Sequence, residues 1–262
     1  PSDIRSSARA DILILNKGTM TFSTSRIIES SNLIFSTGTL TTNDLTVTTL
    51  VPVKGVRRLY KITDGTLTAN RVIIAAADSQ GATKDTWISS VKSTLTVGSF
   101  VLNDANIAKG NVLDIVESTL TVTNFTVKNS TYFEEGGFLN ILRGTQVTVQ
   151  TSTIFGMNYL LISDSCSGLT LQTINFQSTN LHNMIIQIKN AKTLTMNHVY
   201  MDVPLITDNP IDSVINILES GPTININNLT ILNSFTYHGA VHFILQTRYA
   251  AVMLKSSKFV NN

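Results

Sequence analysis

One pattern of apolar residues repeats along almost the whole chain and restricts its fold more than any other feature. With Leu120 as the anchor of a unit, apolar residues stand at the anchor and two, five and seven positions later, at Val122, Phe125 and Val127. The same frame fits units that begin at Leu40, Leu67, Leu95, Leu169, Leu194 and Ile224, and weaker copies begin at Met20, Val147 and Val252. Periods of this length are typical of solenoids, in which each repeat is one structural unit.

Each unit has the spacing expected of three short strands. Leu113 and Ile115 alternate with polar neighbours, and the two later apolar pairs of the frame do the same. A period of two is the pattern of a half-buried strand. Three such strands make one coil of a parallel β-helix, whose coils bury their apolar faces by stacking. The sequence therefore predicts an all-β fold, in which residues 1–262 form a single right-handed parallel β-helix of about ten coils of roughly 20–30 residues.

A residue that permits a sharp bend recurs three positions after the anchor. It is Asn43, Asn70, Gly98, Asn197 and Asn227 in five units, and Asn124 stands one place later in its own unit. Asn and Gly tolerate the left-handed backbone conformation better than other residues. We therefore expect a left-handed residue at this position, between the second and third strands of a coil.

The repeat frame, the variable length of the units and the short Asn-bearing turn resemble the right-handed parallel β-helices of the pectin-lyase-like superfamily. The resemblance covers nearly the whole chain as architecture. It implies a fold whose enzymes degrade acidic polysaccharides with clustered carboxylates, in pectate lyases around Ca²⁺ with Arg or Lys as the base. The abundance of Ile, Asn, Ser and Thr is also similar to that of β-helical surface proteins of protists such as ciliates.

No cluster suited to that chemistry stands out in the sequence. The charged residues nearest to one stand just before the anchors, at Asp64, Lys92, Glu117 and Arg143. Stacked coils place them about 5 Å apart with alternating sign, which is the pattern of a surface ladder of salt bridges. A Ca²⁺ site needs converging carboxylates, and Asp202, Asp208 and Asp212 surround turns, where Asp is common. We therefore assign no catalytic, cofactor-binding or metal-ligating residue.

Composition argues against several other classes of function. Charged residues make up 14% of the chain and the net charge is +2, so no nucleic-acid-binding surface is expected. The basic group Lys54, Arg57 and Arg58 fits a solvated loop. No apolar run approaches the roughly 18 residues that a membrane-spanning helix needs.

The single cysteine, Cys166, rules out an intramolecular disulfide. No metal or catalytic motif includes the histidines, which are His182, His198, His238 and His242.

Interruptions of the frame fall at one phase, after the third strand of one coil and before the first strand of the next. They occupy Val51–Arg58, Ala75–Thr86, Asn103–Asn111, Glu134–Gly137 and Val203–Ser213. Insertions at one phase map to one side of a solenoid, which is often its binding face. Since the sequence starts at Pro1 and stops at Asn262 inside the repeat, we expect it to be a segment of a longer polypeptide.

Three N-glycosylation sequons begin at Asn124, Asn129 and Asn228. Asn124 and Asn228 share one phase, four positions past the anchor, where a glycan would project into solvent. We expect these sites to be occupied, which places the protein outside the cell or on its surface.

The expected function is that of a structural or adhesive extracellular scaffold that presents its loops to a partner. The expected partners are other proteins of a larger assembly or surface glycans. Two alternatives stay open: a polysaccharide lyase or glycoside hydrolase of the pectin-lyase-like class, and a segment of a phage tailspike or bacterial adhesin. Clustered carboxylates on the first strands would favour the enzyme, and occupied sequons would favour a eukaryotic secreted scaffold.

Overall fold

The computed structural model describes residues 2–5, 11–15, 17–28, 32–50, 55–77, 82–104, 106–128, 131–155, 159–177, 185–203, 213–219, 221, 223–234, 236–245 and 251–260. Within these ranges the long regular elements are all β-strands. They are β1 (Ser2–Arg5), β2 (Asp11–Leu15), β3 (Thr19–Ile28), β4 (Asn32–Ser36), β5 (Thr39–Leu50), β6 (Gly55–Thr63), β7 (Thr66–Ala77), β8 (Ala82–Val91), β9 (Thr94–Asn103), β10 (Asn106–Val116), β11 (Thr119–Lys128), β12 (Thr131–Phe155), β13 (Tyr159–Gln177), β14 (Ile186–Asp202), β15 (Ile215–Leu218), β16 (Thr223–Leu232), β17 (Val241–Ile244), β18 (Ala251–Lys255) and β19 (Lys258–Val260).

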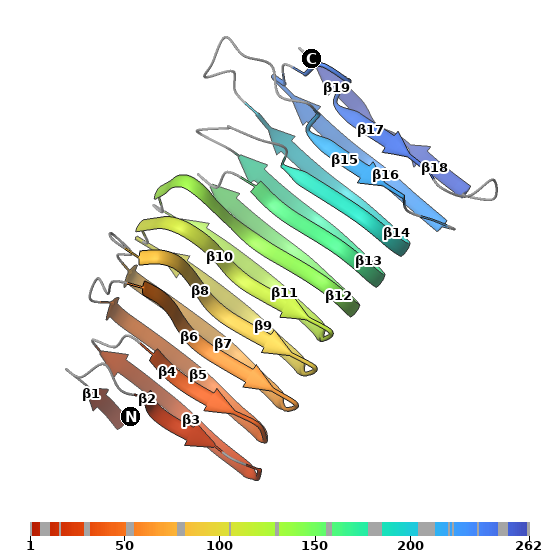
Figure 1. Ribbon diagram of the computed structural model, residues 1–262. Helices are drawn as coiled ribbons and strands as arrows, with labels where there is room; N and C mark the ends of the chain where they lie inside the picture. Colours follow the sequence, from red (N-terminus) through yellow and green to blue (C-terminus); the bar gives the residue numbers. More distant parts are fainter. Residues whose placement is uncertain are drawn as a thin grey trace.

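The strands form a parallel β-solenoid, as the sequence predicts. They stack side by side from the N-terminal end to the C-terminal end, and the two termini lie at opposite ends of the stack (Figure 1). Each pairing joins a strand to its counterpart in the next coil, and the pairings are parallel. The right hand of the coil stays a prediction.

The backbone register confirms the repeat frame residue by residue. Pairing joins the anchors of consecutive coils in one column: Met20, Leu40, Leu67, Leu95, Leu120, Val147, Leu169, Leu194, Ile224 and Val252. From Leu40 to Ile224 these side chains are at most 1% exposed. In the columns that stand two, five and seven positions later, the described side chains between Thr42 and Ile231 are buried as well, so the core is a set of stacked ladders. As expected, Phe100 and Phe125 are neighbours in one ladder, with ring centroids 5.3 Å apart.

The last coil is more exposed than the coils before it, because no described residue packs over it. Val252, Leu254 and Phe259 stand at inward positions of the frame but are 39%, 45% and 41% exposed. The fully packed part of the solenoid is therefore shorter than the ten coils expected from the repeat.

The predicted left-handed bend three positions after the anchor is wrong. In the later coils the left-handed residue stands one place further on, at Thr173, His198 and Asn228, with φ of 54–55°. Asn and Gly recur at the predicted position for a different reason. A Cβ on Gly98 would lie 2.7 Å from the carbonyl oxygen of Asn70, so successive coils approach closely there. The side chain of Asn227 donates a hydrogen bond to that of Asn197 at 3.1 Å.

The interruptions between coils are shorter than predicted, because strand pairing resumes earlier. Strand β6 begins at Gly55, β8 at Ala82 and β10 at Asn106. The predicted connector Glu134–Gly137 lies inside β12, where pairing with β10 joins Lys109 to Glu135 and Asn111 to Gly137. Four of the predicted insertions include residues that lie outside the described ranges, at 51–54, 78–81, 105 and 204–212.

Candidate functional site

The candidate site lies at the corner where the first strand of each coil turns into the second. The turn is made by one residue with positive φ, which is 49° at Asp64 and Lys92, 50° at Glu117 and 54° at Arg143. A left-handed conformation is uncommon for residues other than Gly. It is held here because each turn hydrogen-bonds to the next coil: the Asp64 N–H donates to the Val91 carbonyl at 3.0 Å, and the Lys92 N–H donates to the Val116 carbonyl at 2.9 Å.

The residue after the turn is small in the N-terminal half of the solenoid. It is Gly18, Gly38, Gly65, Ser93 and Ser118 in five successive coils. A Cβ on Gly65 would lie 2.7 Å from the carbonyl oxygen of Gly38, so coils touch through their backbones at this point. Where Ser replaces Gly, its hydroxyl joins the hydrogen bonding. Ser93 Oγ accepts from the Gly65 N–H at 3.1 Å and donates to the Val91 carbonyl at 2.6 Å.

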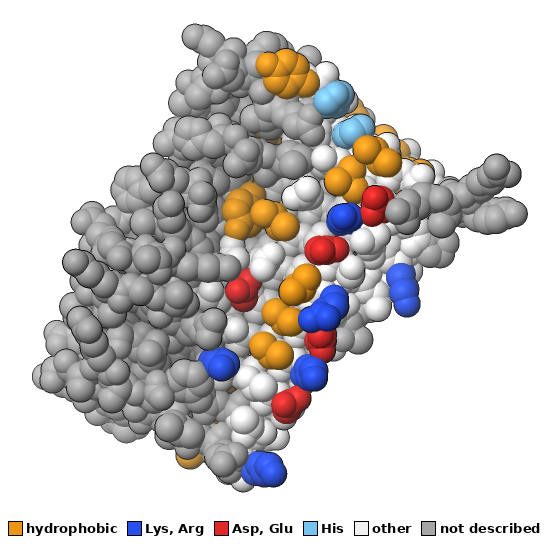
Figure 2. All heavy atoms as spheres, in the orientation of Figure 1, with side chains coloured by type: hydrophobic (Ala, Val, Ile, Leu, Met, Phe, Trp, Pro, Cys, Tyr) orange, Lys and Arg blue, Asp and Glu red, His pale blue; other side chains and the backbone are white. Residues whose placement is uncertain are grey.

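Charged side chains follow one another in a line along this corner (Figure 2). The line contains the four residues predicted to stack, and the turn positions of consecutive coils do bring them together in a column. Arg143 Nη2 lies 2.8 Å from Glu117 Oε1, and Lys189 Nζ lies 3.8 Å from Glu219 Oε2. The four residues therefore alternate in sign along one column as predicted, but Glu117 and Arg143 are the two of them that form an ion pair with each other.

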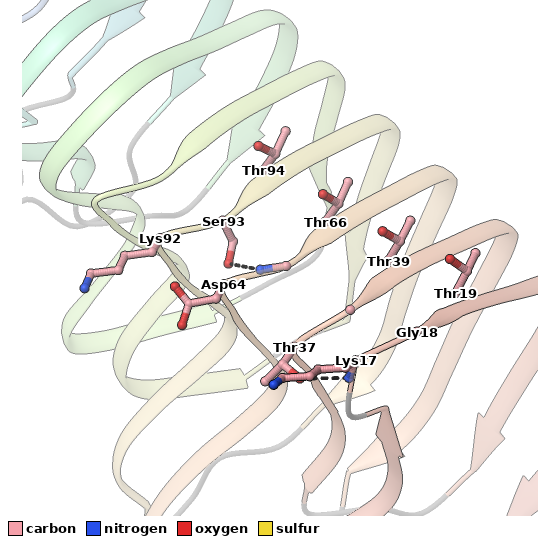
Figure 3. Close-up of a pocket in the computed structure, with 12 residues that line it drawn as sticks. Lys17, Gly18, Thr19, Thr37, Thr39, Asp64, Thr66, Lys92, Ser93 and Thr94 are labelled. Carbon is pink, nitrogen blue, oxygen red and sulfur yellow. Dashed lines mark hydrogen bonds between the residues drawn. The ribbon is translucent and has the colours of Figure 1, made fainter.

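An open groove of about 560 Å³ lies along the N-terminal part of the corner. Its lining repeats over four coils and consists of Lys17, Gly18, Thr19, Thr37, Gly38, Thr39, Asp64, Gly65, Thr66, Lys92, Ser93 and Thr94. Thr19, Thr39, Thr66 and Thr94 stand on neighbouring strands and point the same way, and Asp64 lies between Lys17 and Lys92 (Figure 3). The spacing between paired strands, about 4.8 Å, makes the hydroxyl row roughly 14 Å long.

The chemistry of this groove is that of a polar binding surface. Its threonine hydroxyls both donate and accept hydrogen bonds, its two lysines donate, and the Asp64 carboxylate accepts. The groove is open to solvent and extends over several coils, so it suits a long polar ligand better than a compact one. The turn residues and the row of threonines that build it were not identified as a site from the sequence, although a small residue followed by Thr, an apolar residue and Thr recurs there.

Two of the sequon asparagines, Asn124 and Asn228, lie on another corner of the coil, between the second and third strands. Asn124 is exposed, and pairing places it beside Ser99 and Thr151 of the adjacent coils. Asn228 lies at the matching position with φ of 55°, and its Nδ2 is 2.9 Å from Nε2 of His198. The two residues therefore share a phase but differ in backbone conformation. Asn129 lies outside the described residues.

The described members of the remaining group of Asp and His residues make polar or ring contacts with single neighbours. Asp202 accepts a hydrogen bond from Asn233 Nδ2 at 2.9 Å, while Asp208, Asp212 and His182 lie outside the described residues. His238 and His242 stack with ring centroids 5.2 Å apart. Across the described ranges, no three His, Cys, Asp or Glu residues are grouped so as to hold a metal ion.

A polar network on the first strands was missed by the sequence analysis. Asp114 Oδ1 accepts hydrogen bonds from Asn111 Nδ2 at 3.2 Å and from Asn140 Nδ2 at 2.6 Å. The Tyr159 hydroxyl donates to Asn111, and its ring lies where a Cβ on Gly137 would have to be. Three coils are joined in this way. The available signal was that Asp114 and Asn140 occupy equivalent positions between inward apolar residues.

The described part of the chain contains no helix that is long and apolar enough to cross a membrane. No protein-family model matches the chain, and searches among curated proteins and among solved structures find no similar protein.

Proposed function

We propose that this chain is an adhesive scaffold, a rigid β-solenoid that binds an extended glycan along its corner groove. The observation that carries the proposal is the groove itself, which repeats a threonine hydroxyl in each of four coils and adds two ammonium groups and one carboxylate beside this row. A glycan chain also presents hydroxyl groups at regular intervals. A row of threonines at fixed spacing therefore offers it a series of equivalent hydrogen bonds.

The packing of the solenoid supports a scaffold role. Between Leu40 and Ile231 the described side chains of the inward ladders are almost fully buried. A continuous core of this kind keeps the outward side chains of neighbouring coils in fixed register. The groove residues are thus held in place before a ligand arrives, which lowers the entropic cost of binding.

The proposed setting is the cell surface or the extracellular space. The exposed Asn124 within its sequon supports it, because a glycan attached there would point away from the core. We also propose that the fold is related to the pectin-lyase-like superfamily, on the repeat frame and the stacked ladders. Within such a relationship the protein would have kept polysaccharide binding, with its groove lined by threonine and lysine.

Glycan binding by the purified chain tests the proposal. Immobilised neutral and acidic oligosaccharides are offered to the wild type and to a double variant, Thr66→Val with Thr94→Val. Valine keeps the shape and strand propensity of threonine but removes the hydroxyl. The matched control is Thr46→Val with Thr153→Val, because these two partly exposed threonines lie outside the groove.

The expected result is binding by the wild type and by the control, with at least a roughly tenfold weaker affinity for the groove variant, equivalent to about 1.4 kcal/mol. The bound oligosaccharide is recovered uncut. Failure to bind any oligosaccharide of the panel would overturn the proposal, as would equal binding by the two double variants. Recovery of shortened chains would favour the lyase or glycoside hydrolase instead.

A further inference from the structure

The line of charges along the corner alternates in sign over its whole described length. From the N-terminal end it consists of Lys17, Asp64, Lys92, Glu117, Arg143, Asp164, Lys189 and Glu219. Asp64, Lys92, Glu117 and Arg143 stand at the turn position of successive coils, while Asp164 and Lys189 stand one position earlier, in register with Leu142. Figure 2 shows this line as alternating Lys or Arg and Asp or Glu side chains.

An alternating line with an even number of charges is complementary to itself when it is turned end to end. For the six coils from Asp64 to Lys189, a two-fold axis between Glu117 and Arg143 places each charged coil opposite a coil whose corner carries the opposite charge. Glu117 of one copy then meets Arg143 of the other. One step further out the coil of Lys92 faces the coil of Asp164, and beyond them the coil of Asp64 faces that of Lys189, in both cases with the two charges offset by one residue along the strand. Each pair occurs twice, as it must in an interface with two-fold symmetry.

The centre of this line carries an exposed apolar side chain. Leu142, next to Arg143, is 39% exposed, while the other large exposed apolar residues of the described chain lie at Tyr237 and beyond. Register pairs Leu142 with the partly exposed Val116, next to Glu117. The proposed axis passes between them, so Leu142 of one copy would cover Val116 of the other. An apolar centre with charges around it is the usual composition of a protein–protein interface.

Ion pairs within one chain leave part of the line unsatisfied. Arg143 and Glu117 pair with each other, but their side chains remain 61% and 32% exposed and can contact a second partner. Asp64 and Lys92 form no ion pair with a described residue, although they stand in adjacent coils. A ladder that served only to stabilise one chain would have no use for Leu142 at its centre.

We propose that two copies of this chain associate antiparallel along the corner, through the charges from Asp64 to Lys189 with Leu142 and Val116 at the centre. The six charged positions span five coil spacings, roughly 24 Å. Exposed ion pairs are individually weak and are screened by salt. The association is therefore weak and weakens further as ionic strength rises. This inference does not rest on glycan binding, although Asp64 and Lys92 also line the groove.

The test uses charge reversal at two residues that do not line the groove. Glu117→Arg places two arginines opposite each other in a pair of identical chains, and Arg143→Glu places two glutamates opposite each other. When the two variants are mixed, every arginine at these two positions of the first chain faces a glutamate of the second chain, so opposite charges meet again. Ion pairing within a single chain cannot produce this recovery, because each variant chain keeps its like charges.

Sedimentation velocity at low and at physiological ionic strength measures the association constant of each sample. The control is Arg71→Glu, which breaks an ion pair of the same kind, Arg71 Nε to Asp44 Oδ1 at 3.0 Å, on a different corner. Circular dichroism checks that every variant keeps its strand content. We expect each corner variant to associate at least roughly tenfold more weakly than the wild type, since one broken symmetric pair counts twice. The mixture should recover most of the lost affinity, and the control should match the wild type.

Three results would overturn the proposal. They are a wild-type chain that stays monomeric at low ionic strength, a mixture that associates no better than its components, and a control that loses as much affinity as the corner variants. Loss of glycan binding would not bear on it, because neither Glu117 nor Arg143 lines the groove.

Discussion

At the scale of single residues, whether a side chain points into the core or outward decides which substitutions its position tolerates. Phe125 is 1% exposed and packs against Phe100, whereas Thr121 points outward on the same strand and is partly exposed. We expect Phe125→Asp to abolish folding, because it buries a charge without a partner. Thr121→Asp should leave the strand signal in circular dichroism intact. An equal loss of signal in both variants would contradict the register.

The single thiol provides a second test at this scale. Cys166 is 2% exposed, and burial raises the pKa of its thiol above the ordinary value because the charged thiolate loses its hydration. Near pH 8.5, where a free cysteine is about half ionised, Cys166 should therefore remain largely protonated and unreactive. Alkylation followed by mass spectrometry should label it slowly in the native chain and rapidly in denaturant. Fast native labelling would show that the thiol is accessible.

Glycosylation of Asn124 tests the proposed extracellular location of the protein. Its side chain is exposed, and the next residue, Phe125, points into the core, so a glycan on Asn124 leaves the packing undisturbed. Glycopeptide mass spectrometry of the protein from its natural source should find Asn124 modified. Unmodified sequon peptides throughout would remove the ground for an extracellular location.

At the scale of elements, the corner turns depend on close contact between backbones. A Cβ on Gly65 would lie 2.7 Å from the Gly38 carbonyl oxygen and 3.3 Å from Cγ2 of Ile62. Gly65→Ala should therefore reduce the free energy of unfolding by about 1–3 kcal/mol, the usual cost of overpacking. Thr68→Ala, on the exposed side of β7, should change it by less than about 0.5 kcal/mol. Denaturant titration followed by circular dichroism compares the two.

The strands were predictable because the signal that defines them is local. An apolar pair with a polar residue between its members fixes which side chains face inward, and the frame then fixes which coils pair. The position of the left-handed bend was not predictable in the same way. Asn at the third position looked like a bend residue, but Gly98 is required by the backbone of the coil beneath it, and that contact is invisible in a single repeat.

One part of the candidate site could be predicted from the repeat, and the other parts could not. The charged column from Asp64 to Arg143 follows from the repeat frame, because residues at one phase stack. The groove needed the structure, since its lining combines small residues after the turn with threonines of the next strand in four coils. The network of Tyr159, Asn111 and Asp114 also needed it, because Tyr159 reaches across two coils.

At the scale of the whole molecule, one corner carries both proposed interactions. The groove occupies its N-terminal part, and the self-complementary charges occupy its middle. Asp64 and Lys92 belong to both, while Lys17, Thr19 and Thr39 belong to the groove alone. Both proposals depend on the solenoid holding equivalent residues of adjacent coils side by side over many coils.

The central claim is therefore that equivalent residues of adjacent coils lie side by side. Engineered disulfides test this directly, because they form only between residues that are close together. Thr68 pairs with Thr96 of the next coil, while Thr121 lies one coil further on. In a Cys166→Ala background, cysteines at 68 and 96 should cross-link on mild oxidation, since paired strands lie about 4.8 Å apart. Cysteines at 68 and 121, about twice as far apart, exceed the roughly 7 Å limit for a disulfide and should stay reduced. Peptide mass spectrometry of dilute samples identifies the bond. Efficient cross-linking of the second pair, or none of the first, would contradict the register on which the account rests.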